Sequence, residues 1–399
     1  MPQTKRQRAA THSTAPVVER AYLVAVQAKG DRDGLSAEDS LAELALLAHT
    51  AGAEVVGRAV QRLERPNPAC YIGRGRLAEI VAERDDTSYT LVLFDDVLSP
   101  TQQRNLEKEL GVKVLDRTAL IIDIFARRAH SREARLQVEL AQSQYLLPRL
   151  AGQWSHLERL EGRIGTRGPG ETQLETDRRL VRGRLTRLRR ELEAVRGQRS
   201  LYRRRRRRQG AQVVALVGYT NAGKSTLMRA LSGADVLTED LLFATLDPIT
   251  RRIHLPSNPS TGSGQAEALL TDTVGFIQKL PTELVAAFRA TLEELSDADL
   301  LLHVVDITHQ NAEEQFETVE QTLRELGLAE KPRIVALNKV DLLAPDANGE
   351  ALAALPPALR RPDSEIVLIS AAKGWNLDVL LAAIERELER LKAQRLVPA

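Results

Sequence analysis

Short runs rich in apolar residues alternate with amphipathic stretches over the first third of the chain. The runs predict strands at 21–26, 53–56, 89–94 and 112–115. Between them, apolar residues recur at helical spacing and predict helices at 35–50, 77–82 and 101–110. Strands that alternate with helices indicate a small α/β domain with a parallel sheet, which we place at residues 20–126.

Two long helical segments follow, at about residues 127–148 and 172–199. In the second, apolar side chains repeat in heptads at Leu174, Val181, Leu185, Leu188, Leu192 and Val195. A helix with such a seam packs along a neighbour, so residues 127–200 are predicted to form a long antiparallel hairpin with a glycine-rich, basic tip at 162–170. Residues 1–19 are expected to be a disordered tail, and 201–210 an arginine-rich linker.

In the second half of the chain, four apolar runs are each followed by a short polar motif. The runs lie at 213–217, 268–270, 334–337 and 366–369. Because the carboxyl ends of parallel strands meet at one edge of a sheet, the four motifs are expected to converge. The fold class predicted for residues 211–395 is therefore α/β, a Ras-like P-loop GTPase domain.

The first motif matches the phosphate-binding pattern G-x-x-x-x-G-K-[ST] between a strand and a helix. It consists of Gly218, Tyr219, Thr220, Asn221, Ala222, Gly223, Lys224 and Ser225. Its backbone N–H groups and the helix N-terminus would surround the phosphates. Lys224 should reach the β- and γ-phosphates, and the Ser225 hydroxyl should bind Mg²⁺.

The later motifs supply the remaining contacts to metal, phosphate and base. They are Asp272-Thr273-Val274-Gly275, Asn338-Lys339-Val340-Asp341 and Ser370-Ala371-Ala372. Asp272 is placed to hold Mg²⁺, and the Gly275 N–H to sense the γ-phosphate. The Asp341 carboxylate can accept hydrogen bonds from guanine N1–H and its amino group; adenine offers neither, so this residue selects GTP over ATP.

A further nucleotide contact is predicted in Phe243-Ala244-Thr245-Leu246-Asp247. Thr245 would close onto Mg²⁺ and the γ-phosphate only in the GTP state, which makes Ser225, Thr245 and Asp272 the predicted metal ligands. The alternative is a surface threonine that precedes a strand.

Composition narrows the class of protein. The chain has 399 residues and a net charge of +2, and its one cysteine, Cys70, excludes an intrachain disulfide and fits a cytoplasmic location. No apolar run is long enough to cross a membrane. Residues 151–210 hold 18 Arg, no Lys and 7 acidic residues, a net of +11, which leaves −9 for the rest. Such a division favours a nucleic-acid partner; a membrane-associated fraction, held by Arg203–Arg208, is the alternative.

The stretch from Ile164 through Arg179, followed by this GTP-binding domain, resembles the HflX family of ribosome-associated GTPases. The resemblance covers roughly residues 20–390 and implies a monomer that binds the large ribosomal subunit and splits stalled or idle ribosomes. It implies that the hairpin tip approaches the peptidyl transferase centre, with contacts from Arg163, Gly165, Arg167, Gly168 and Gly170. Arg163 stands where the family usually has a second glycine.

The catalytic group is not identified by the sequence. Phe276 follows Asp-x-x-Gly, where many GTPases carry a water-orienting glutamine, so slow intrinsic turnover is expected. Asn221 would instead serve as a K⁺ ligand between the phosphates, or it simply suits a tight loop. A nucleotide-gated protein that blocks subunit joining by occupancy, with hydrolysis only for release, remains an alternative to an active splitting enzyme.

Overall fold

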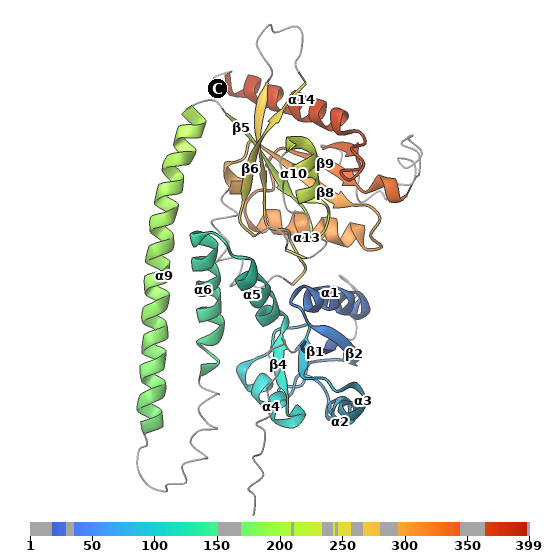
Figure 1. Cartoon of the computed structure of the whole chain (residues 1–399), viewed down its shortest axis with the longest axis vertical. Helices are drawn as coiled ribbons and strands as arrows, with labels where there is room; N and C mark the ends of the chain where they lie inside the picture. Colours follow the sequence, from blue (N-terminus) through green and yellow to red (C-terminus); the bar gives the residue numbers. More distant parts are fainter. Residues whose placement is uncertain are drawn as a thin grey trace, which may run out of the picture.

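The computed structural model describes residues 18–28, 36–150, 169–208, 211–233, 242–243, 246–256, 266–279, 294–343 and 364–396. It confirms two α/β units, stacked one above the other in Figure 1. In the part of the chain that is described, no helix is both long and apolar enough to span a membrane.

The N-terminal unit is built on a four-stranded parallel sheet of order β2-β1-β3-β4. Its elements are β1 (Arg20–Ala28), α1 (Ala37–Thr50), β2 (Glu54–Leu63), α2 (Arg74–Ala82), α3 (Arg84–Thr87), β3 (Leu91–Phe94), α4 (Pro100–Leu110), β4 (Lys113–Asp116) and α5 (Arg117–Arg128). Every predicted strand and helix of this unit is present, with shifted ends.

The second unit contains a six-stranded sheet of order β10-β9-β8-β5-β7-β6, in which only β6 is antiparallel to its neighbour. Its elements are β5 (Gln212–Val217), α10 (Lys224–Ser232), β6 (Ile249–His254), β7 (Glu267–Asp272), β8 (Leu300–Asp306), α13 (Ala312–Glu325), β9 (Arg333–Asn338), η1 (Val340–Leu342), β10 (Glu365–Leu368) and α14 (Leu377–Leu396). The strand ends that carry the motifs therefore lie at one edge of this sheet.

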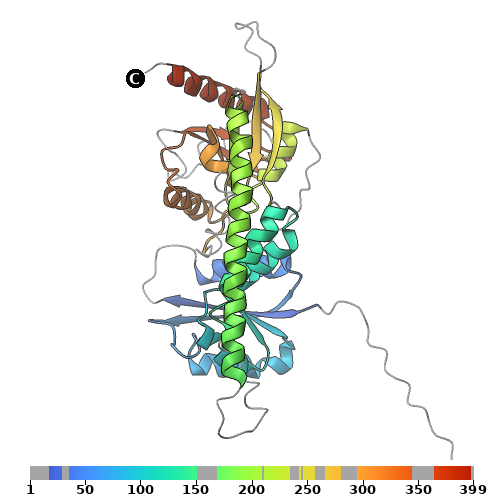
Figure 2. The same cartoon turned by 90° about the vertical axis from the view of Figure 1, so that its left-hand side faces the viewer.

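Two helices, α6 (Arg132–Leu146) and α9 (Pro169–Arg208), lie side by side at the flank of both units (Figures 1 and 2). Leu136 and Leu140 pack against Leu185, Leu188 and Leu192, which are heptad positions. Arg199 pairs with Glu133 at 2.8 Å and Arg184 with Glu139 at 2.6 Å, so the helices run antiparallel. The segment between them, which includes most of the predicted tip, lies outside the described residues.

The structure differs from the expected helices in two places. A continuous helix was expected from residue 127, but the chain turns at Ala129–Ser131, where Ser131 accepts a hydrogen bond from the Ala134 N–H and begins α6. The preceding helix, α5, was not predicted, although its apolar residues are buried and its polar residues Asp123, Arg127 and Arg128 lie nearer the surface. At its other end α9 continues to Arg208, so the arginines assigned to a linker are helical.

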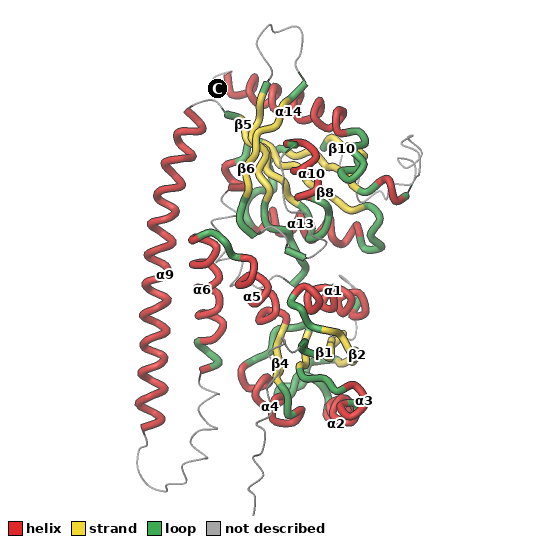
Figure 3. The backbone as a smooth tube through the Cα atoms, in the orientation of Figure 1, coloured by secondary structure: helices red, strands yellow, loops and turns green. Residues whose placement is uncertain are grey.

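The two units share one hydrophobic core. Leu44 of α1 and Phe125 of α5 belong to the same buried cluster as Tyr219 and Phe276 of the second unit. The tube drawing in Figure 3 shows α1 and α5 between the two sheets. The loops that follow β5 and β7 therefore face helices of the N-terminal unit.

Candidate functional site

The loop between β5 and α10 has the backbone that its glycines predict. Gly218 has φ +152° and Gly223 has φ +95°. A Cβ on Gly218 would lie 2.3 Å from the Val304 carbonyl oxygen, and one on Gly223 would lie 2.2 Å from Asn338 Nδ2. Both positions therefore require glycine. The loop formed in this way leads its backbone amides to the start of α10.

Lys224 is buried inside this loop. Its Nζ donates to the carbonyl oxygens of Gly218 at 3.0 Å and Tyr219 at 2.6 Å. Burial lowers the pKa of Lys224 to about 8, against the opposing effect of Asp272. An ammonium held in this way gains most from a nearby anion, such as a phosphate.

The predicted metal ligands Ser225 and Asp272 meet. The Ser225 hydroxyl donates to Asp272 Oδ2 at 2.7 Å, and Asp272 is fully buried at the end of β7. A hydroxyl and a carboxylate are oxygen ligands of the kind that Mg²⁺ takes together with phosphate oxygens and water. Among the described residues, no group of three or more His, Cys, Asp or Glu side chains is arranged so that it could hold a metal ion. The third predicted ligand, Thr245, lies outside the described residues, as does Ala244.

The structure joins the phosphate loop to the two base-recognition motifs. Asn338 Nδ2 donates to the Ala222 carbonyl at 2.9 Å, and Asn338 Oδ1 accepts the Ala371 N–H at 3.0 Å. The Ser370 hydroxyl donates to Asp341 Oδ1 at 2.6 Å. Asn338 is thus a cross-link that sets the distance between the phosphate loop and the base pocket.

Lys339 and the backbone around it give Asp341 its position. Lys339 has φ +68°, and its ammonium lies 2.7 Å from Asp306 at the end of β8. The chain then forms η1, which contains Asp341. A carboxylate fixed by Ser370 is oriented before the base arrives, which limits the entropic cost of binding.

Two predicted nucleotide contacts have other partners in this structure. The ring of Phe243 packs edge-on against Phe125 of α5, with centroids 4.6 Å apart. Asp247 accepts the N–H groups of Ser131 at 2.9 Å and His130 at 3.2 Å, and also the Ser131 hydroxyl. The side chain of Phe243 therefore contacts α5, and that of Asp247 contacts the start of α6. The sequence reasoning missed both roles.

The Asp-x-x-Gly loop lies directly on the phosphate loop. Thr220 N–H donates to the Phe276 carbonyl at 2.8 Å, and Phe276 N–H donates to the Gly218 carbonyl at 3.1 Å. A Cβ on Gly275 would lie 2.9 Å from Lys224 Nζ. The ring of Phe276 is buried in the shared core and cannot orient a water molecule.

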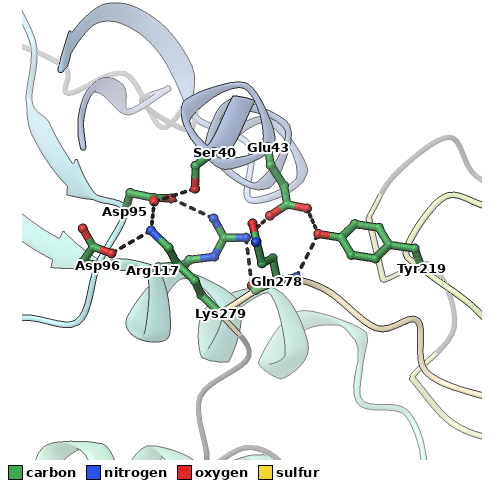
Figure 4. A network of polar contacts seen from close by, with 8 residues as sticks. All are labelled: Ser40, Glu43, Asp95, Asp96, Arg117, Tyr219, Gln278 and Lys279. Carbon is green, nitrogen blue, oxygen red and sulfur yellow. Dashed lines mark hydrogen bonds and ion pairs between the residues drawn. The ribbon is translucent and has the colours of Figure 1, made fainter. Parts of the chain in front are cut away.

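The sequence reasoning also missed a group of charged residues between the units. Tyr219 of the phosphate loop donates its hydroxyl to Glu43 of α1, and Glu43 pairs with Arg117 of α5 (Figure 4). The only sequence signal was the acidic pair Asp95-Asp96 at a strand end, because no motif relates residues so far apart.

The predicted ribosome contacts cannot be placed in the same way. Arg163, Gly165, Arg167 and Gly168 lie outside the described residues, and Gly170 belongs to the first turn of α9.

Comparisons with known proteins cover all three parts of the chain. Family models match residues 38–126 (GTP-binding GTPase N-terminal), 128–206 (GTP-binding GTPase Middle Region) and 213–339 (50S ribosome-binding GTPase). Among solved structures, the chain is similar to a GTP-binding protein from Sulfolobus solfataricus in complex with GDP. The match spans 94% of this chain and 100% of that protein's chain, with 26% sequence identity and a TM-score of 0.46.

Two relatives carry the same description, GTPase HflX. The one from Caldanaerobacter subterraneus subsp. tengcongensis is 50% identical over 370 residues, which are 93% of this chain and 81% of the relative. The one from Escherichia coli (strain K12) is 46% identical over 325 residues, which are 82% of this chain and 74% of the relative. With this identity along most of its length, and with the nucleotide loops joined as described, the chain belongs to the HflX family of GTPases.

Proposed function

We propose that this GTPase binds the large ribosomal subunit in its GTP form and promotes the splitting of stalled or idle ribosomes, with hydrolysis resetting the cycle. The observation that carries the proposal is a chain of contacts: Asp247 accepts hydrogen bonds from Ser131 at the start of α6, and α6 packs along α9. At about 1.5 Å per residue, the 40 residues of α9 extend roughly 60 Å. The family model for residues 213–339, described as a 50S ribosome-binding GTPase, supports the same partner.

The charge of α9 fits ribosomal RNA. Arg178 is half-buried, while Arg179, Arg189 and Arg190 are exposed on the helix. Several basic side chains on one long helix attract a phosphate backbone without a need for base recognition. We propose that α9 binds rRNA along its length and that Arg163, Gly165, Arg167, Gly168 and Gly170 contact RNA near the peptidyl transferase centre.

At the nucleotide, Gly218–Ser225, Asp272–Gly275, Asn338–Asp341 and Ser370–Ala372 are proposed to bind GTP with Mg²⁺ held by Ser225, Asp272 and Thr245. We also propose K⁺ as a second cation, held by the exposed Asn221. A cation at this position would offset the charge that develops between the phosphates during transfer. We further propose that the protein acts as a monomer in the cytoplasm, where ribosomes are found.

The second candidate function is occupancy without active splitting. The buried ring of Phe276 favours it, because a site with no water-orienting side chain at this position hydrolyses GTP slowly. In that case the GTP form would block subunit joining, and hydrolysis would serve only for release.

The test combines binding and splitting. Co-sedimentation with isolated large subunits should be strong with a non-hydrolysable GTP analogue and weak with GDP or without nucleotide. Replacing Arg189 and Arg190 by Gln should weaken binding, whereas the same change at Arg386 and Arg390 of α14 provides the matched control. Binding that ignores the nucleotide would contradict the proposal. A GTP form that keeps separated subunits apart but does not speed the dissociation of intact ribosomes would favour occupancy.

A further inference from the structure

Eight polar residues form a joint between the N-terminal unit and the two phosphate-facing loops (Figure 4). The N-terminal unit contributes Ser40 and Glu43 from α1, Asp95 and Asp96 after β3, and Arg117 from α5. The GTPase unit contributes Tyr219, Gln278 and Lys279. Gln278 and Lys279 follow Gly275, the residue expected to sense the γ-phosphate.

One half of the joint is buried. The Arg117 guanidinium pairs with Glu43, and it also pairs with Asp95 Oδ1 at a distance of 2.8 Å. The same guanidinium donates a hydrogen bond to the Gln278 carbonyl oxygen at 3.1 Å. The Tyr219 hydroxyl donates to Glu43 and accepts the Gln278 N–H at 2.8 Å. Because Arg117 is 1% exposed, opening these contacts would leave charges buried without partners. This half acts as a fixed support for Tyr219 and Gln278.

The other half is partly exposed. The Lys279 ammonium contacts Asp95 and, at 2.7 Å, Asp96, and the Lys279 side chain is 40% exposed. Water can replace these contacts at a much lower cost than those of Arg117. Lys279 also has φ +52°, a conformation that L-residues other than glycine rarely adopt. The two carboxylates therefore hold a strained backbone in place.

In this structure the segment after Gly275 lies on the phosphate loop, and the ring of Phe276 in this segment is buried. It is also attached at Phe276 to Gly218 and Thr220, and at Gln278 to Tyr219. In this position the segment offers the phosphates no side chain that could orient water, because the ring of Phe276 is buried in the shared core; a shift of the segment is one way to admit such a group. The contact that opens at the lowest cost is the one made by Lys279.

We propose that Lys279 is a positioning residue for GTP hydrolysis, and that its contacts with Asp95 and Asp96 form a latch that must open before each turnover. Arg117, Glu43 and Tyr219 are the support against which the segment turns. The nucleotide loops are thus under the direct control of the N-terminal sheet, through one lysine.

The experiment measures ribosome-free GTP hydrolysis by the full chain. Lys279→Met and Asp96→Asn should each raise kcat by about two- to fivefold, the effect expected for the loss of a partly exposed ion pair from the ground state. KM should stay within about twofold, because the pair does not touch the nucleotide. Lys279→Arg, which keeps the charge, should return kcat toward the parent value.

Arg252→Met is the matched control, because Arg252 forms an exposed pair with Glu267 at 3.3 Å on the edge strand of the same unit. Its kcat should equal that of the parent. Thermal melting of every variant separates a latch from a loss of folding, and Asp96→Asn leaves the contact between Lys279 and Asp95 in place. A kcat for both latch variants no higher than that of the parent, or an equal rise in Arg252→Met, would overturn the proposal.

Discussion

In each of the two sheets, one strand leads to a buried aspartate, and the two aspartates have different roles. Asp272 follows β7 and lies next to the Ser225 hydroxyl at the start of α10. Asp95 follows β3 and lies between Arg117 and Lys279. Both carboxylates are at most 1% exposed.

The difference lies in what faces each carboxylate. Opposite Asp272 are a hydroxyl, a glycine-rich loop and an amine, groups suited to a metal and phosphates. Opposite Asp95 are two cations of the chain itself, so its charge is already matched. Burial alone would raise the pKa of Asp95, but Arg117 and Lys279 lower it below its ordinary value. A buried acid at a strand end is therefore a candidate site when phosphate- and metal-binding groups surround it, rather than two cations that pair with it inside the fold.

The exchange of each aspartate for asparagine tests this contrast most strongly. Asp272→Asn should lower kcat by roughly 100-fold or more through loss of a metal ligand, with little change in the free energy of unfolding. Asp95→Asn should lower the free energy of unfolding by about 3 kcal/mol, because Arg117 loses a buried partner. Denaturant titration and steady-state kinetics on both variants give the comparison. If Asp95→Asn also abolished metal-dependent nucleotide binding in folded protein, the contrast would fail.

Asp341 offers a second carboxylate whose charge is left for a ligand. Asp341→Asn should weaken GTP binding by about 100-fold, since two hydrogen bonds to the base are lost, and should shift preference toward xanthosine triphosphate. A nucleotide competition assay measures both effects, with Asp123→Asn, which changes a partly exposed carboxylate paired with Arg127 in the N-terminal unit, as the matched control. An unchanged preference would remove Asp341 from the base pocket.

The buried side-chain amine of Lys224 predicts that GTP binding depends on pH. Burial lowers the pKa of Lys224 to about 8, and phosphates raise it again by favouring the charged form. Binding therefore takes up a proton above pH 8, so GTP affinity should fall as pH rises, by up to about tenfold per pH unit. Titrations from about pH 7 to about pH 9.5 would show this slope in the parent and its absence in Lys224→Met. A flat profile in the parent would contradict the assignment.

The smallest effect concerns Asn221, for which the structure supports two explanations. Its φ of +61° is a conformation that asparagine tolerates, which explains the residue without any ion. If it binds K⁺, hydrolysis should be several-fold faster in potassium chloride than in sodium chloride. Asn221→Gly separates the two, because glycine keeps the backbone and removes the ligand. Equal parent rates in the two salts would retire the K⁺ proposal.

Much of the site could be predicted because its chemistry is local in the sequence. A phosphate loop needs glycines at set spacing and a lysine and a hydroxyl at the helix start. The motif can therefore be recognised from the sequence alone at Gly218, Gly223, Lys224 and Ser225. The heptads at Leu185, Leu188 and Leu192 likewise predicted a packed helix. These features depend on neighbours a few residues away, and local geometry decides them.

The tertiary structure alone decided what surrounds that site. It turned Phe243 and Asp247 toward α5 and α6, began a separate helix, α6, after Ser131, and joined Tyr219 to Glu43 across 176 positions of sequence. Charge pairing between distant residues leaves no spacing rule in the chain, because only the packing of one unit on the other brings Arg117 and Lys279 to the same carboxylate. The sequence by itself determined which loops carry the nucleotide motifs, and the fold determined that they meet at one edge of the sheet and what holds them in place.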